Sequence, residues 1–159
     1  NLPAAHKMVN PNYIGLQADS IPHIHEDDNK VDIHLISGEW KGQKAKIQSY
    51  GNINLFRIDF KEGAKLNVNI PDENNIFFYV VRGNLNVNDS VATFRELIQF
   101  EEGTDNISIE APEDSIILLG HAKPFNEPII AHGPFVMNTE QQIMEAYNDF
   151  RSGKMGNWN

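Results

Sequence analysis

Short runs in which apolar and polar residues alternate dominate the middle of this 159-residue chain. The segment 31–35 alternates Val, Ile and Leu with Asp and His, and the same period of two recurs at 66–70, 85–88 and 107–110. This period places the apolar side chains on one face of a β-strand, so each run predicts a strand covered on one side. Gly, Asn-Asp and Pro-Asp turn signals separate the runs by roughly 8 to 12 residues, a spacing typical of a β-sandwich or a jelly-roll barrel.

Three segments depart from this alternation. The runs 76–81 and 116–119 are apolar throughout, which predicts central strands buried on both faces. In the segment 53–60 the apolar positions shift register between Leu55 and Phe56. Such a slip predicts a bulge, or a strand that bends from one sheet to another.

One helix is predicted near the C-terminus. Thr139 and Gln142 have the spacing of a capping box, in which each side chain bonds the other residue's backbone. Ile143 and Tyr147 then fall on one helical face, and Gly153 is a suitable stop. We therefore expect an all-β fold with one short helix over residues 139–153.

Composition narrows the classes of function. Lys and Arg total 13 and Asp and Glu total 22, so the net charge is −9. An acidic surface repels phosphate, which argues against direct nucleic-acid binding and against anionic membranes. The chain has no cysteine, which excludes disulfides, zinc–thiolate sites, iron–sulfur clusters and a cysteine nucleophile. We expect a cytoplasmic protein, with the nucleus as the alternative in a eukaryote.

Motifs at both ends of the chain resemble a known family. Asn-Leu-Pro-Ala opens the chain at 1–4, Glu-Pro stands at 127–128, and Gly-Pro-Phe-Val-Met-Asn follows at 133–138. Gly-Lys-Met-Gly at 153–156 completes the set. Together these segments resemble the carboxy-terminal half of pirin-like proteins, members of the cupin superfamily, and the resemblance covers essentially the whole chain.

The resemblance implies a cupin-type jelly-roll β-barrel in a protein built from two such barrels. Pirin-like proteins hold iron in the first barrel, on three histidines and a glutamate, and some are similar to quercetin 2,3-dioxygenases. We therefore expect an extended arm over residues 1–30 that leads from a missing N-terminal cupin barrel, a metal-free barrel over 31–138, and the helix over 139–153. This chain alone would have no activity, whereas its parent would be a metal-dependent dioxygenase.

Two partners follow from the resemblance. The first is the N-terminal cupin barrel of the same parent protein, which this domain would support. The alternative is a protein partner, because nuclear pirins are described as iron-dependent cofactors of transcription factors. An acidic surface suits a basic protein partner better than it suits DNA.

The cupin metal motif can be tested residue by residue. Its first part, G-x5-H-x-H-x3,4-E-x6-G, fits the spacing of the segment 63–83 but places Asn69, Pro71 and Ile76 at the three ligand positions. In its second part the fourth ligand position falls on Ile117. Pro and Ile side chains cannot bind a metal, so we expect no cofactor in this chain and iron only in the missing barrel.

Two further groups of residues are candidates for binding. His121, Glu127, His132 and Phe135 flank or follow a proline-rich loop, and could meet a small ligand or the neighbouring barrel. The competing interpretation is that the histidines bond backbone groups in a loop. His23 and His25 form the chain's one H-x-H pair and are candidate metal ligands, with Glu26 or Asp27 as a third.

The competing interpretation of this pair is a polar loop before the strand at 31–35.

Overall fold

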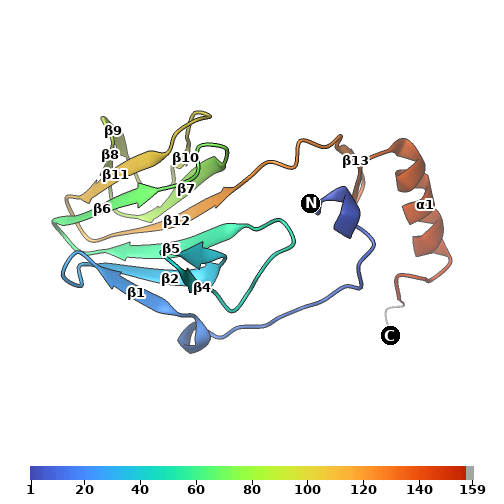
Figure 1. Cartoon of the computed structure of the whole chain (residues 1–159), viewed down its shortest axis with the longest axis horizontal. Helices are drawn as coiled ribbons and strands as arrows, with labels where there is room; N and C mark the ends of the chain where they lie inside the picture. Colours follow the sequence, from blue (N-terminus) through green and yellow to red (C-terminus); the bar gives the residue numbers. More distant parts are fainter. Residues whose placement is uncertain (157–159) are drawn as a thin grey trace. The chain divides into compact units, whose positions relative to one another are not determined.

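The computed structural model describes residues 1–156, which form two compact units. The larger unit spans Tyr13–Pro124, and the smaller combines Asn1–Asn12 with the segment that starts at Phe125. Figure 1 shows both units and labels most of their strands and the helix α1. Among the described residues there is no helix with the length and apolar character needed to cross a membrane.

Two antiparallel sheets build the larger unit (Figure 1). The six-stranded sheet has the order β1 (His23–Glu26), β2 (Val31–Ser37), β5 (Asn54–Phe60), β12 (Ser115–Ala122), β7 (Asn75–Arg82) and β10 (Leu97–Gln99). The four-stranded sheet has the order β6 (Ala64–Asn69), β11 (Asn106–Ala111), β8 (Leu85–Val87) and β9 (Ser90–Ala92). A small hairpin, β3 (Glu39–Trp40) and β4 (Gln43–Lys44), and the 3-10 turn Ala18–Ser20 complete this unit.

One apolar core fills the space between the two sheets. The inward side chains of β2 are fully buried, and they share a single cluster with inward residues of β5, β6, β7, β11 and β12. The expected all-β jelly roll with one helix is confirmed. Its barrel consists of two sheets packed face to face, a common solution for strands that have one apolar face.

The predicted slip in β5 is confirmed as an irregularity of strand pairing. Leu35 of β2 pairs with Phe56, but the next pair joins Ser37 to Leu55, so Ile36 is the extra residue. The bulge therefore lies on β2, opposite the place where the apolar pattern of β5 changes face. A bulge of this kind lets a strand bend while its neighbour keeps its pairing.

The prediction that 76–81 is buried on both faces is wrong. In β7, Ile76, Phe78 and Val80 point into the core, whereas Phe77 and Val81 are 39% and 44% exposed. The outward side chains of β12 are only half-buried. An apolar run does not by itself show that both faces of a strand are covered, because the outer face of this sheet keeps apolar residues at the surface.

The smaller unit contains the 3-10 turn Ala4–His6, the hairpin β13 (Ile130–His132) and β14 (Phe135–Met137), and α1 (Glu140–Arg151). The predicted capping box is present, since the Thr139 hydroxyl accepts a hydrogen bond from the Gln142 backbone and the Gln142 side chain accepts one from Thr139. Ile143 and Ala146 form the buried face of α1.

The boundaries of the compact units differ from the expected division into 1–30, 31–138 and 139–153. Residues 1–12 of the expected arm belong to the smaller unit, where the Ala4 backbone donates to Glu127 over 2.8 Å. Residues 23–26 of the same arm form β1, an edge strand of the large sheet. The sequence signals for both features are short, so neither distinguishes its segment from an extended arm.

Candidate functional site

The cupin ligand positions on β6 do not face the core. Pairing with β11 turns Leu66, Val68 and Ile70 inward, each 3% exposed. Asn69 and Pro71, which occupy the histidine positions of the motif, are exposed. The spacing of the motif is thus kept, and its two histidine positions lie at the surface, where they border a cavity instead of the core.

The remaining motif positions and the rest of the interior are apolar. Ile76 and Ile117 are both buried in the core cluster. Within residues 1–156 the buried polar residues are Ser37 and Ser115, and their hydroxyls donate to backbone carbonyls of Ile53, and of Asn84 and Glu113. Among the described residues, the fully buried set therefore contains no imidazole and no carboxylate.

His121 lines a cavity of about 340 Å³ in the larger unit. Trp40, Asn54 and Asn67 are among the other lining residues. Burial lowers the pKa of His121 from 6.5 to about 4, so the imidazole is neutral at pH 7. Its Nδ1 lies 2.9 Å from the Asn74 amide nitrogen and accepts from it, which leaves the proton on Nε2. His121 can therefore exchange hydrogen bonds in this cavity but carries no charge.

Glu127 links two segments of the smaller unit. One carboxylate oxygen, Oε2, accepts hydrogen bonds from the Ala4 backbone at 2.8 Å and from the Asn138 side chain at 3.1 Å. Asn138 also donates to the Pro128 carbonyl. These contacts join the first residues of the chain to the segment before α1, and they give Glu127 a structural role.

His132 and Phe135 lie together on the β13–β14 hairpin, where they form a strand pair. Both contact Tyr147 of α1: the His132 Nδ1 is 2.9 Å from the Tyr147 hydroxyl, and the Phe135 ring centroid is 4.9 Å from that of Tyr147. They hold the hairpin against the helix. Three of the four residues predicted as one group thus belong to the smaller unit, and His121 belongs to the larger one.

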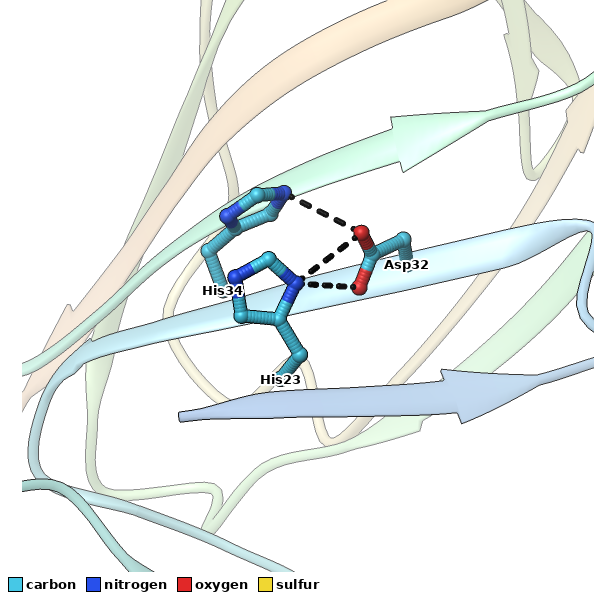
Figure 2. Close-up of side chains that lie close together, drawn as sticks. All are labelled: His23, Asp32 and His34. Atoms are coloured by element: carbon cyan, nitrogen blue, oxygen red, sulfur yellow. Dashed lines mark hydrogen bonds and ion pairs between the residues drawn. The ribbon is translucent and has the colours of Figure 1, made fainter. Parts of the chain in front are cut away.

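His23, Asp32 and His34 form a cluster on the outer face of the six-stranded sheet (Figure 2). The His23 Nδ1 lies 3.2 and 3.1 Å from the two Asp32 oxygens, and the His34 Nε2 lies 3.3 Å from Oδ2. Strand pairing causes this arrangement, because His23 of β1 stands directly opposite His34 of β2. Asp32 points to the same face as His34, two residues away on the same strand.

The two carboxylates at this cluster have different partners. Arg57 on β5 binds Asp59 through Nε and Nη2, at 2.8 and 2.7 Å, so the Asp59 charge is neutralised. Asp32 stands directly opposite Asp59, and within residues 1–156 its ion pairs are with His23, His25 and His34. Burial lowers the pKa of His34, and the nearby Asp32 carboxylate opposes that effect.

The neighbours of His23 in sequence are engaged elsewhere. Glu26 accepts hydrogen bonds from Trp40 Nε1 and Lys41 Nζ, at 2.8 and 2.7 Å. Asp27 accepts one from the Lys65 backbone at 2.9 Å. Neither is therefore placed as a third ligand beside His23, and His25 lies farther out, with its Nδ1 3.6 Å from Asp32.

Sequence reasoning missed Asp32 and His34, although a signal was present. H-x-H at 23–25 and D-x-H at 32–34 are separated by a polar turn. If that turn closes a hairpin with Glu26 opposite Val31, as observed, His23 must face His34. Considering the register of the two strands together would have found the cluster.

Comparison with known proteins assigns the fold to a family. The family model described as "Pirin C-terminal cupin domain" matches residues 55–156. Human pirin is 35% identical over 164 residues, covering 98% of this chain and 55% of that protein. A pirin-like protein of Caulobacter vibrioides is 31% identical over 156 residues, covering 97% and 56%.

A solved structure has the same fold as this chain and a similar level of sequence identity to it. The crystal structure of a quercetin 2,3-dioxygenase from Acinetobacter baumannii has a TM-score of 0.89 and 32% identity, and the match covers 98% of this chain and 55% of that one. The chain spans about half the length of the curated relatives it matches. Because the family model covers more than half of the chain, the protein belongs to the pirin family and carries its C-terminal cupin domain.

Proposed function

We propose that this chain is the metal-free cupin half of a two-barrel pirin-like protein. Its role is to support an N-terminal cupin barrel that holds iron and carries out the chemistry. The parent protein is a quercetin 2,3-dioxygenase-like enzyme, and this half has no dioxygenase activity by itself.

The apolar interior is the observation that carries the proposal. Iron(II) in a cupin requires several imidazole and carboxylate donors that converge inside the barrel. Here the inward residues on and just after β6 are Leu66, Val68 and Ile70. Ile76 and Ile117 belong to the same core. Carrying a metal charge into this space without donors would cost several kcal/mol, on the order of 5 or more.

The lengths of the relatives support a second barrel. Both named relatives and the A. baumannii enzyme are nearly twice as long as the part that matches this chain. The name of the A. baumannii protein, quercetin 2,3-dioxygenase, supplies the activity proposed for the parent. The N-terminal barrel of the parent is accordingly the partner that we propose for this domain.

Oxygen consumption with quercetin tests the proposal. The purified chain, with and without added Fe²⁺, should consume oxygen no faster than Fe²⁺ and quercetin alone. The upstream coding sequence should encode an H-x-H cupin motif, and the longer protein should turn over quercetin. Turnover by the 159-residue chain, or an upstream sequence without cupin ligands, would contradict the proposal.

Metal analysis needs a variant that distinguishes metal bound inside the barrel from metal bound at the surface. Elemental mass spectrometry on a His34→Gln/Asp32→Asn variant removes the outward-facing donors and leaves the core intact. We expect iron far below one equivalent in this variant. Stoichiometric iron would place a metal site somewhere other than the outer cluster and would contradict the metal-free assignment.

A further inference from the structure

We propose that His23, Asp32 and His34 bind a divalent transition metal ion, such as Zn²⁺ or Ni²⁺, on the outer face of the six-stranded sheet. This inference is independent of the proposed function, because the site lies outside the core in which a cupin holds its metal. The surface of this domain would thus have a metal site although its interior has none.

The donor atoms have the spacing of a coordination shell. Zn²⁺ binds imidazole nitrogen at about 2.0–2.1 Å in a tetrahedral arrangement, which puts neighbouring donors roughly 3.3 Å apart. The nitrogen–oxygen distances here are 3.1 and 3.3 Å, and one donor atom from each residue lies within 4.8 Å of the other two. In Figure 2 both imidazoles direct a nitrogen at the same carboxylate. Small adjustments would therefore suffice to admit an ion.

The backbone preorganises this geometry. His23 and His34 are a cross-strand pair of a β-hairpin, and Asp32 and His34 are alternate residues of one strand. The ring centroids of His23 and His34 are 4.1 Å apart. The folded hairpin already holds two of the ligands on β2 and the third on β1. Little further conformational entropy is therefore lost when a metal binds.

One ring nitrogen of the cluster makes no hydrogen bond. The His34 Nε2 is buried and makes no hydrogen bond of acceptable geometry, and the His34 side chain is only 16% exposed. A buried nitrogen without a partner normally costs free energy, and a metal ion is one way to satisfy its lone pair. A dication would also offset the negative charge of Asp32, which, unlike Asp59 opposite it, has no arginine bound to its carboxylate.

Open coordination positions are available beside the cluster. A hollow of about 320 Å³ is lined by His23 and His34, with Asp19, Ile21 and Arg57 around it. Three protein ligands and adjoining space are the arrangement of zinc sites that keep a position for water or another small ligand. The proposed site would therefore hold an exchangeable water besides its three protein donors.

Titration calorimetry with Zn²⁺ on the chain, free of any affinity tag, tests the site directly. We expect one ion per chain for the wild type. His34→Gln and Asp32→Asn should each weaken binding by at least about 100-fold, since even outer-shell partners of metal ligands are worth about 10- to 100-fold. Co²⁺ should give visible absorption bands of a low-coordinate site in the wild type and none in His34→Gln.

His25→Gln is the matched control, because it removes a histidine from the same strand but not from the cluster. It should weaken Zn²⁺ binding by less than about tenfold, because within the cluster His25 reaches only Asp32, at 3.6 Å. Unfolding curves of the metal-free variants establish that each is folded. Unchanged affinity in His34→Gln would overturn the proposal, as would loss of binding in His25→Gln alone or a wild type that binds no Zn²⁺.

Discussion

The two faces of β2 differ sharply in chemistry. Val31, Ile33 and Leu35 point inward and are completely buried, whereas Asp32 and His34 point outward and form a cluster with His23. In cupins that bind metal through the H-x-H motif, the donors point inward. Here the inward residues of β2 are apolar, and its imidazole and carboxylate groups lie on the outer face.

This difference shows that the residues that form the core and the residues that form a surface site can alternate along one strand. A strand offers two sets of positions, and substitutions in one set leave the other set untouched. The core of this domain can therefore become fully apolar without restricting the outward residues. The predictions below test that independence.

Removing a leucine from the inner face should have the largest effect. Leu119 of β12 is fully buried, so Leu119→Ala leaves a cavity and should lower the free energy of unfolding by about 2–5 kcal/mol. Leu97→Ala is the control on the same sheet, where Leu97 is 67% exposed, and should cost less than about 0.5 kcal/mol. Urea denaturation measures both, and similar losses would mean that the faces do not differ as described.

The second largest loss of stability is expected at the tight contact between Gly120 and the Phe77 ring on the outer face. A Cβ at Gly120 would collide with the Phe77 ring, which packs over this glycine from the neighbouring strand. Gly120→Ala should therefore destabilise by about 1–3 kcal/mol, the usual cost of overpacking. In a Phe77→Ala background the same change should cost much less. Additive losses in the double variant would exclude this contact as the cause.

The pH dependence of stability should reveal the partly buried His121. Its pKa is about 4 in the folded chain and 6.5 in the unfolded chain, so the unfolded state takes up the proton first as pH falls. The stabilising effect of the neutral imidazole is complete above pH 6.5 and declines as pH falls towards 4. Urea midpoints at pH 7 and pH 5 should therefore differ more for the wild type than for His121→Gln. Equal differences in the two proteins would contradict the assignment.

The smallest effect is expected from the cluster itself when no metal is present. His34 contributes no hydrogen bond through Nε2, so His34→Gln should change the free energy of unfolding by less than about 1 kcal/mol. Urea unfolding in the presence of a chelator measures it. A loss as large as that of Leu119→Ala would show that the outer cluster is part of the structural core.

Much of the fold followed from local pattern. The alternation at 31–35 predicted β2 with its correct inward residues, and Thr139 with Gln142 predicted the start of α1. These signals succeed because strand faces and helix caps are properties of neighbouring residues. The apolar run 76–81 misled because exposed Phe77 and Val81 look the same in sequence as buried ones.

The sites were harder to predict because they depend on pairing between strands. The spacing of the cupin motif fitted 63–83, but only pairing with β11 shows that Asn69 faces outward. In the same way, His23 acquires Asp32 and His34 as neighbours only through the register of one hairpin. The family resemblance covered the chain but contained no information about this outward cluster.

The place of β1 at the edge of its sheet has a consequence for amide exchange. β1 pairs with β2 alone, so its backbone should open to solvent more readily than that of β12, which has a neighbour on each side. Each opening carries His23 away from the other two residues of the cluster. An ion held by all three would slow hydrogen–deuterium exchange in β1 while leaving exchange in β12 unchanged.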